Sequence, residues 1–347
     1  MMAAEKNDFL DYALDHGFGE LHFKVDVETG MKAIIAIHNT KLGPALGGCR
    51  FIEYPDTATA LEDAMRLARG MSYKSALANL PLGGGKSVII KPSHPIDREA
   101  YMHRFGEFVN DLGGRYVTAL DSGTQLSDMD IMFQHTPHVA SLSSYNGDPS
   151  PSTATGVFRG IQAAVLFKTG KDNLEGLHIA IQGLGHVGYM LAGLLHESGA
   201  KLTVADINPI TVERVVKECG ATAVSTDDIH KVACDVFSPC ALGAIINDTS
   251  LNQLQTSIIA GAANNQLAHT YHGQKLHDKG ILYAPDYVIN AGGVIFAASK
   301  YLNTSDAIVS SQIDRIRTTL LDIFTRSKQD NRPTSEIADT MAQEILA

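Results

Sequence analysis

The spacing of apolar residues changes several times along the chain, and each change predicts a different element. The run MKAIIAIH, Met31 to His38, is apolar almost throughout, which indicates a buried strand. A polar, turn-rich segment, Ser143 to Gly156, interrupts the apolar patterns and predicts a domain boundary. Before this boundary, the pattern predicts helices over 8–16, 57–70 and 97–112 and strands over 21–25, 31–38, 87–90 and 116–120.

Beyond the boundary, short apolar runs alternate with helical patterns, which is typical of parallel strands joined by helices. The predicted strands cover 177–182, 201–205, 236–237, 258–261 and 281–283, and the predicted helices cover 157–168, 189–197, 306–327 and 334–346. We therefore expect an α/β protein with two domains. The first is an α/β domain over residues 1–142, and the second is a doubly wound domain over residues 143–327.

The composition is that of a globular protein and excludes several classes of partner. Of the 347 residues, 44% are hydrophobic and 19% are charged, which allows a packed core. A net charge of -10 without a basic cluster argues against a nucleic-acid partner. No apolar run reaches the length of a membrane span, and the N-terminus is too acidic for a signal peptide, so we expect a cytoplasmic protein without a membrane partner. The four cysteines form no Cys-x-x-Cys pair, and we expect reduced thiols and no metal site.

The most specific motif lies in the second domain. A predicted strand leads into GLGHVG, in which Gly183, Gly185 and Gly188 form a G-x-G-x-x-G pattern that includes Val187. A helix and a second strand follow, and Asp206 lies eighteen positions beyond the last glycine. Such glycines let a pyrophosphate approach a helix N-terminus, and such an aspartate accepts hydrogen bonds from a ribose. The motif predicts a Rossmann-type dinucleotide site; the alternative is that the glycines serve only close packing of strand and helix.

Two lysines in the first domain bracket a glycine run. In GMSYKSALANLPLGGGKSVIIK, Lys74 lies near the end of a helical pattern and Lys86 follows Gly83, Gly84 and Gly85 directly. We expect these glycines to form a turn with positive φ that leads into a strand. A lysine at the mouth of that strand would be partly desolvated, which lowers its pKa toward the range of a general base. The alternative is that both lysines are solvated surface charges.

Other turns could contribute to the same chemistry. Asp121 follows a predicted strand and precedes a glycine, so it could hold a lysine or take a proton, or it could cap the helix predicted to begin near Ser127. LGPALGGCRF is expected to form a turn whose exposed amides meet a ligand, or a simple connection between strands. In the second domain, polar turns follow the predicted strands at 238–241, 262–265 and 290–293, the edge at which doubly wound sheets bind ligands.

Together these segments resemble the amino-acid dehydrogenase family that includes glutamate, leucine, phenylalanine and valine dehydrogenases. The likeness covers nearly the whole chain and is carried, in one order, by MKAIIAIHNTKLGPALGGCR, ARGMSYKSALANLPLGGGKSVII, IAIQGLGHVG, SPCALGAIIND, IIAGAANNQL and YAPDYVINAGGVI. It implies a substrate domain followed by a dinucleotide domain, with a cleft that closes over the substrate. It also implies that the C-terminal helix, residues 328–347, packs back on the first domain.

The resemblance implies a role for each matching residue. Lys74 would bind the substrate α-carboxylate with help from the backbone amide of Gly47, while Lys86 and Asp121 would transfer protons and activate water. Thr153 and either Asn264 or Asn265 would contact the nicotinamide or the substrate. The substrate side chain would lie against Leu46, Ala119, Val294 and Ala297, and the dinucleotide against Gly183, Gly185, Val187, Gly188, Asp206, Cys240 and Ala241.

The implied reaction is the reversible, NAD-dependent oxidative deamination of apolar, branched-chain L-amino acids, leucine above all, to 2-oxo acids and ammonia. Two alternatives stay open: a member that prefers phenylalanine or valine, and a catalytically silent dinucleotide-binding regulatory protein. The chain has Ala297 where related sequences often have valine, and its C-terminal segment is shorter than the usual tail of the family. We expect a homo-oligomer that is at least a dimer, with an octamer possible.

Overall fold

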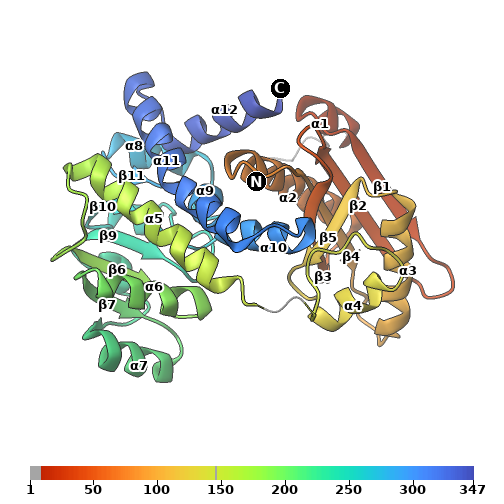
Figure 1. The fold of residues 1–347 in the computed structure, drawn as a ribbon, viewed down its shortest axis with the longest axis horizontal. Helices are drawn as coiled ribbons and strands as arrows, with labels where there is room; N and C mark the ends of the chain where they lie inside the picture. Colours follow the sequence, from red (N-terminus) through yellow and green to blue (C-terminus); the bar gives the residue numbers. More distant parts are fainter. Residues whose placement is uncertain (1–8, 145–146) are drawn as a thin grey trace. The chain divides into compact units, whose positions relative to one another are not determined.

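The computed structural model describes residues 9–144 and 147–347, which form two compact units (Figure 1). Unit 1 comprises the described residues up to Gly147 together with 297–303 and 345–347, and unit 2 comprises 148–296 and 304–344. Each unit combines a β-sheet with helices, so the expected α/β class is confirmed.

Unit 1 is built on a five-stranded mixed sheet. The strands follow one another in space as β1 (Glu20–Val25), β2 (Lys32–Asn39), β4 (Gly83–Ile90), β3 (Ala45–Ile52) and β5 (Tyr116–Leu120). β2 pairs antiparallel with β1 and β4, whereas β3 pairs parallel with β4 and β5. The predicted strands are confirmed. β3 is an additional strand, which the pattern did not predict because the glycines of LGPALGGCRF favour a turn.

Gly47, Gly48 and Gly83 to Gly85 lie in strands, so the turns predicted at these glycines are wrong, whereas 41–44 do form a turn before β3. Gly47 lies within β3, and Gly83 to Gly85 open β4 without positive φ. Close packing is the reason for glycine here. A Cβ at Gly84 would lie 2.0 Å from the backbone nitrogen of Ser72, and a Cβ at Gly47 would lie 1.8 Å from the carbonyl oxygen of Gly85. A side chain at these positions would therefore collide with main-chain atoms of the neighbouring element.

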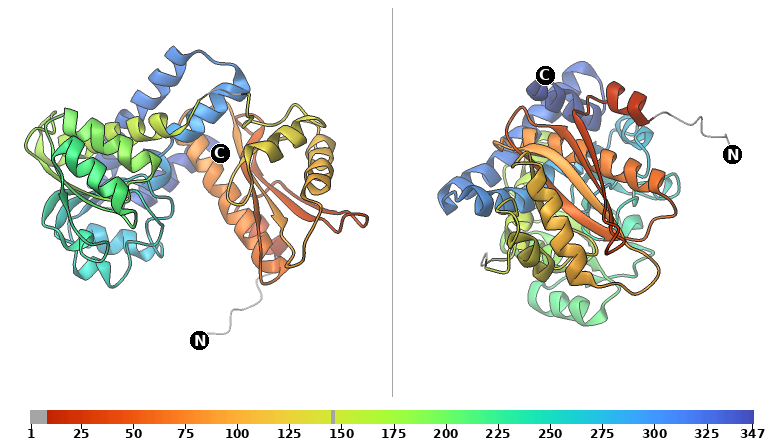
Figure 2. Two further views of the ribbon diagram at one scale, coloured as in Figure 1. Left: turned by 90° about the horizontal axis from the view of Figure 1, so that it is seen from below. Right: turned by 90° about the vertical axis from the view of Figure 1, so that its right-hand side faces the viewer.

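Helices cover both faces of this sheet (Figure 2). α2 (Thr57–Leu77) and α1 (Phe9–Asp15) pack on one face, and α3 (Arg98–Asp111) and α4 (Leu126–Phe133) pack on the other. Alternate residues of β2 serve the two cores: Ala33, Ile35 and Ile37 face α3, whereas Ile34 and Ala36 face α2. Because both faces are covered, the strand is apolar without alternation, as the run MKAIIAIH predicted.

Unit 2 is built on a six-stranded parallel sheet. In space the order is β11 (Leu282–Tyr283), β10 (Thr256–Ile259), β9 (Cys234–Pro239), β6 (His178–Gln182), β7 (Lys201–Ala205) and β8 (Thr222–Ala223). Counted in chain order within the sheet, this is 6-5-4-1-2-3, the order of doubly wound dinucleotide-binding domains. The strand order reverses between β6 and β9, and ligands of such sheets bind at that switch point.

The helices of unit 2 begin at or before the residues that the sequence pattern predicts. They are α5 (Ser150–Thr169), α6 (His186–Glu197), α7 (Pro209–Cys219), α8 (Tyr271–Asp278), α9 (Asp286–Ile289), the start of α10 (Gly292–Leu302), α11 (Asp306–Asp330) and α12 (Thr334–Leu346). α5 starts within the polar segment, with Pro151 in its first turn, where a missing N–H leaves no bond unmade. α6 starts within the glycine motif, and in the described chain no helix is long and apolar enough to cross a membrane.

Helix α12 groups mainly with unit 2, and its packing on the first domain stays a prediction. Its residues through Glu344 group with unit 2, and only 345–347 group with unit 1. The hydroxyl of Tyr287 donates to Asp339 at 2.6 Å, and Arg326 pairs with Glu344 at 2.9 Å. These contacts join α12 to α9 and α11 of unit 2.

Candidate active site

Two of the predicted catalytic residues meet in unit 1. Lys86 lies in β4 and is only 6% exposed, and its ammonium donates to Oδ2 of Asp121, which follows β5. Asp121 can approach because Gly48 has no side chain: a Cβ there would lie 2.7 Å from Cβ of Asp121. Lys74 lies in the last turn of α2, the helix that packs on β4. The interpretation of Lys86 as a solvated surface charge is therefore wrong.

Burial changes the acidity of Lys86. Loss of solvation is the main cause that lowers its pKa to about 7, and the positive charges of Arg50 and Lys74 act in the same direction. A lysine with this pKa is about half neutral near pH 7. It can therefore accept a proton at neutral pH, which an ordinary lysine cannot do.

Asp121 is held by its own turn and does not cap a helix. α4 begins at Leu126, and Gln125 and Asp128 form its capping box. The backbone N–H of Asp121 donates to the hydroxyl of Thr124 at 3.0 Å, and that oxygen also lies 3.0 Å from the carbonyl oxygen of Cys49 in β3. These contacts tie the turn to the sheet, so the carboxylate is presented to β4 rather than to the helix.

An arginine next to this pair was missed by the sequence analysis. Arg50 in β3 donates to Oδ2 of Asp63 at 2.7 Å, and its Nε lies 3.7 Å from Oδ2 of Asp121. Tyr54 donates to the same oxygen of Asp63 at 2.7 Å. The sequence contains one signal for Arg50: it is the only charged residue in the strand ALGGCRFI. The glycines of this segment favoured the prediction of a turn instead.

The residues predicted for the substrate side chain have different degrees of burial. Leu46 in β3 is 1% exposed, and Ala119 in β5 is half-buried. Val294 and Ala297 are half-buried and lie one turn apart in α10. Val294 belongs to unit 2 and the other three belong to unit 1. Their place in a side-chain pocket stays a prediction, as does the contact of Gly47 with the substrate.

The three glycines of the G-x-G-x-x-G motif differ in what a side chain would meet. Gly183 has φ +95° and its Cβ would lie 2.7 Å from Cβ of Ala241 across the switch point. A Cβ at Gly188 would lie 2.0 Å from the carbonyl oxygen of Gly183. Gly185, at the N-cap of α6, is exposed and a Cβ there would meet nothing within 4 Å. Packing explains two of the glycines but not Gly185, whose open backbone fits the approach of a pyrophosphate to the helix.

Asp206 is oriented toward this motif by backbone amides. The N–H of Leu184 donates to its Oδ2 at 2.5 Å, and the N–H of Asn208 donates to its Oδ1 at 2.8 Å. Each carboxylate oxygen accepts more than one hydrogen bond, so both retain capacity for ribose hydroxyls. The geometry of the motif and of Asp206 thus fits a nicotinamide dinucleotide with its adenosine ribose at Asp206.

The other residues predicted around the dinucleotide lie near the carboxyl ends of the strands. The N–H of Cys240 donates to the carbonyl oxygen of Gln182 at 2.7 Å, which joins the ends of β9 and β6. The side-chain amide of Asn290 donates to Asn264 at 2.7 Å, and a Cβ at Gly293 would lie 2.9 Å from the hydroxyl oxygen of Thr153. Of the segments predicted as turns after the strands, 262–265 is a loop, whereas 238–239 belong to β9 and 292–293 open α10. Contacts of a ligand with the remaining predicted residues stay predictions: Thr153, Val187, Cys240, Ala241, Asn264 and Asn265.

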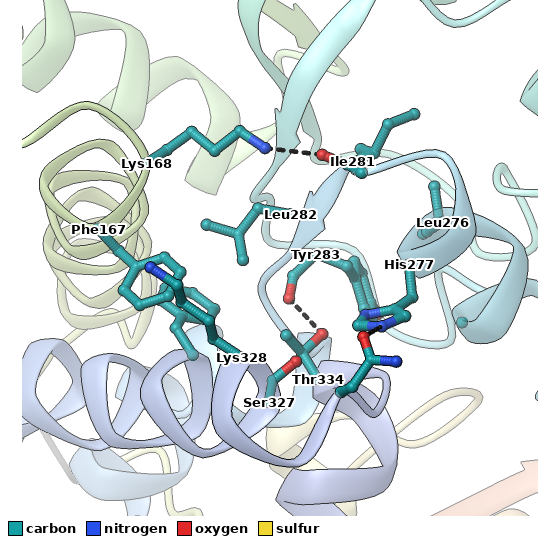
Figure 3. A pocket seen from close by; sticks show the side chains of 14 residues that line it. Phe167, Lys168, Leu276, His277, Ile281, Leu282, Tyr283, Ser327, Lys328 and Thr334 are labelled. Atoms are coloured by element: carbon teal, nitrogen blue, oxygen red, sulfur yellow. Dashed lines mark hydrogen bonds between the residues drawn. The ribbon is translucent and has the colours of Figure 1, made fainter.

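A separate cavity of about 230 Å³ lies in unit 2 at the junction of α5, α8, β11 and the α11–α12 connection. Figure 3 shows Lys168 bonded to the carbonyl oxygen of Gly280 and Thr334 bonded to that of Tyr283 in its wall. None of the predicted site residues lines it. It is smaller than ordinary cofactor pockets, which have about 300 Å³ or more. Within the described residues, no three His, Cys, Asp or Glu side chains gather as a metal site.

Comparison with known proteins finds family matches in both units of the chain. The family described as Glu/Leu/Phe/Val dehydrogenase, dimerisation domain, matches residues 18–138, and that described as Glutamate/Leucine/Phenylalanine/Valine dehydrogenase matches residues 208–336. A leucine dehydrogenase of Geobacillus stearothermophilus is 49% identical over 342 residues, which cover 98% of this chain and 93% of the relative.

Solved structures extend the likeness to the fold. The crystal structure of L-tryptophan dehydrogenase from Nostoc punctiforme has a TM-score of 0.90 at 41% identity and covers 97% of this chain and 98% of that one. A hetero-hexameric glutamate dehydrogenase from Thermus thermophilus has a TM-score of 0.75 at 18% identity over 97% and 93% of the two chains, and is similar in fold alone.

Proposed function

The chain belongs to the glutamate/leucine/phenylalanine/valine dehydrogenase family, and on this premise we propose that it catalyses the reversible, NAD-dependent oxidative deamination of branched-chain L-amino acids. Membership implies a nicotinamide dinucleotide and a small-molecule substrate. The observation that carries the proposal is the buried Lys86, with a pKa of about 7, in contact with Asp121. The same chain contains a glycine motif and an aspartate that fit the dinucleotide.

The residues divide the chemistry between them. A bound nicotinamide dinucleotide would supply the hydride acceptor for oxidation of the substrate α-carbon to an imine. Lys74 supplies a positive charge for the substrate carboxylate. Neutral Lys86 takes a proton from water as the water oxygen adds to the imine carbon. Asp121 relays that proton from Lys86 to the departing nitrogen, and the hydroxyl of the adduct returns its proton to Lys86 as the carbonyl forms, so that ammonia leaves and a 2-oxo acid remains. The net reaction consumes one water and one amino acid.

A substrate panel tests this proposal directly. Absorbance at 340 nm with NAD should rise with leucine, isoleucine and valine and stay flat with glutamate, whose charged side chain would be desolvated in an apolar pocket. Phenylalanine and tryptophan belong in the panel because a relative of 41% identity is a tryptophan dehydrogenase. If no amino acid supports NADH formation while the protein binds NAD, the silent regulatory alternative gains support and the enzyme proposal fails.

Asp206 leads to a prediction about the choice of cofactor. Its carboxylate would lie against the 2′-phosphate of NADP, and the two residues that follow, Ile207 and Asn208, supply no positive charge. We expect kcat/KM with NAD to exceed that with NADP by at least tenfold, since one desolvated like-charge contact is worth about 1.4 kcal/mol or more. Steady-state kinetics with both cofactors measure this ratio, and equal values would show that Asp206 does not meet the ribose.

Ala297 leads to a prediction about substrate range. Its methyl group lies one helical turn from Val294, and alanine leaves more room than a valine would at this position. We expect activity on leucine, isoleucine and valine with tolerance for methionine or phenylalanine. Ala297→Val should raise the leucine-to-phenylalanine ratio of kcat/KM about tenfold, because a few buried methylenes discriminate by about 1–3 kcal/mol. An unchanged ratio would mean that Ala297 does not line the pocket.

We also propose that the protein is a homo-oligomer with a dimer as its minimum unit. The matched N-terminal domain is described as a dimerisation domain, and β1 at the edge of the sheet in unit 1 exposes Phe23 and Val25, which are 55% and 65% exposed. Exposed apolar side chains on an edge strand favour pairing with a second chain. Light scattering at micromolar concentration should therefore give at least twice the chain mass of 37.2 kDa, and a stable monomer would contradict the proposal.

A further inference from the structure

Arg50 has a buried nitrogen for which the structure gives no hydrogen-bond partner. Its Nε is buried and unbonded within the described chain, and it lies 3.7 Å from Oδ2 of Asp121. An unsatisfied donor of a charged group is unfavourable unless a nearby charge compensates for it. The nearby charge is the carboxylate that also contacts Lys86.

The other end of the guanidinium is anchored. Nη1 of Arg50 donates to Oδ2 of Asp63 at 2.7 Å, and the hydroxyl of Tyr54 donates to the same oxygen at 2.7 Å. Burial raises the pKa of Asp63, but the hydrogen bond from Tyr54 and the charge of Arg50 more than offset it, and the pKa stays below its ordinary value. Asp63 is therefore a carboxylate at neutral pH. It holds Arg50 in one orientation, with Nε toward Asp121.

We propose that Arg50, anchored by Asp63, is a positioning residue that holds the carboxylate of Asp121 against Lys86 and shares its negative charge. This inference deepens the proposed function, on which it rests. The two cations lie against the same carboxylate oxygen, so Arg50 fixes the position of Asp121 next to Lys86. The contribution of Arg50 is geometric and electrostatic, and it does not need to touch the substrate.

The effect of Arg50 on the pKa of Lys86 has a definite direction, which follows from the charged groups on each element around Lys86. β3 presents Arg50, which lowers the pKa of Lys86, and Cys49, which raises it. α2 presents Asp63, which raises this pKa, and Lys74, which lowers it. The turn after β5 presents Asp121. β2 adds no charge at neutral pH, because burial lowers the pKa of His38 to about 4. Removing Arg50 should therefore raise the pKa of Lys86, and removing Asp63 should lower it.

The test compares variants of Arg50 and Asp63. Arg50→Gln should lower kcat for leucine roughly ten- to a hundredfold and shift the acidic limb of the pH profile of kcat/KM upward by about one unit. Arg50→Lys keeps the charge but loses the planar guanidinium, so kcat should fall while the limb stays in place. Asp63→Asn should shift the limb in the opposite direction, downward. A role limited to folding would not produce shifts of opposite sign.

Arg66→Gln is the matched control, because Arg66 pairs with Oδ1 of Asp63 at 3.0 Å but its side chain is 52% exposed. It should leave kcat and the limb unchanged. The pKa of Lys86 is also measured without turnover, from the pH dependence of its acetylation by acetic anhydride, read by peptide mass spectrometry. If no amino acid is a substrate, only the proposed function is contradicted. The role of Arg50 is still tested, because acetylation measures the pKa of Lys86 without turnover. An unmoved labelling midpoint in both Arg50→Gln and Asp63→Asn would overturn the inference about Arg50.

Discussion

Replacing Lys86 with alanine should lower kcat for leucine oxidation by about 10²–10⁴-fold, the range expected when a general acid–base group is lost. The physical reason is that no other group with a pKa near 7 contacts Asp121 in the described part of the chain. The methyl group of alanine cannot take the proton from water as it adds to the imine. The variant removes one partner of a buried ion pair, but Arg50 remains 3.7 Å from the carboxylate of Asp121 and compensates part of its charge.

Two further lysines serve as references for this variant. Lys74→Ala should mainly raise KM for the amino acid, because it removes a charge for the substrate carboxylate rather than a proton acceptor. Lys91→Ala, just beyond β4 and exposed, should change neither constant. Circular dichroism confirms folding and initial rates at 340 nm give the constants. Near-normal kcat in a folded Lys86→Ala protein would show that the general base is another residue.

The pH profile of the unmodified enzyme belongs to the same prediction. The pKa of Lys86 is lowered, so the neutral form that deamination requires increases as pH rises through about 7. Log kcat/KM for leucine oxidation should therefore rise with pH below that value and level off above it, apart from a second limb at higher pH from the amino group of the free substrate. Reductive amination requires the protonated lysine and should decline over the same interval. A flat deamination profile across pH 7 would contradict the assignment.

Replacing Gly84 with alanine should destabilise the protein by about 3 kcal/mol or more, the upper part of the range for overpacked interiors. The added Cβ would lie 2.0 Å from the backbone nitrogen of Ser72 and 2.4 Å from its Cα. Since these are main-chain atoms, the whole of α2 would have to move from β4. Lys74 lies two residues beyond Ser72 in α2, so the displacement should also weaken substrate capture.

Gly70→Ala is the matched control for this second prediction. Gly70 lies in the same helix, two residues before Ser72, and a Cβ there would meet nothing within 4 Å. Alanine in a helix interior is favoured over glycine by about 0.5–1 kcal/mol, so this variant should be slightly more stable than the parent. Urea unfolding of the two variants and the parent measures both effects. Equal stability of Gly84→Ala and the parent would show that α2 and β4 separate without cost.

The sequence by itself determined the helices and strands whose apolar residues recur with a clear helical or strand period. It also determined the dinucleotide motif, whose residues lie close together in the chain. The strand 116–120 and the helix 334–346 match β5 and α12, and GLGHVG with Asp206 predicted the turn of the doubly wound sheet. Each of these depends on residues close together in the chain. Lys86 was identified because three glycines precede it, although the reason assumed for those glycines was wrong.

The tertiary structure decided the rest, because glycine has no side chain and its local pattern does not distinguish a turn from close packing. Only the approach of α2 to β4 reveals that Gly84 makes room for Ser72. Likewise, Arg50 is separated from Asp63 by 13 residues and from Asp121 by many more, and only the pairing of β3 with β5 and the packing of α2 bring the three together. Charges that far apart in the chain interact through the fold, so the acidity of Lys86 is a property of the packed sheet rather than of its neighbours in sequence.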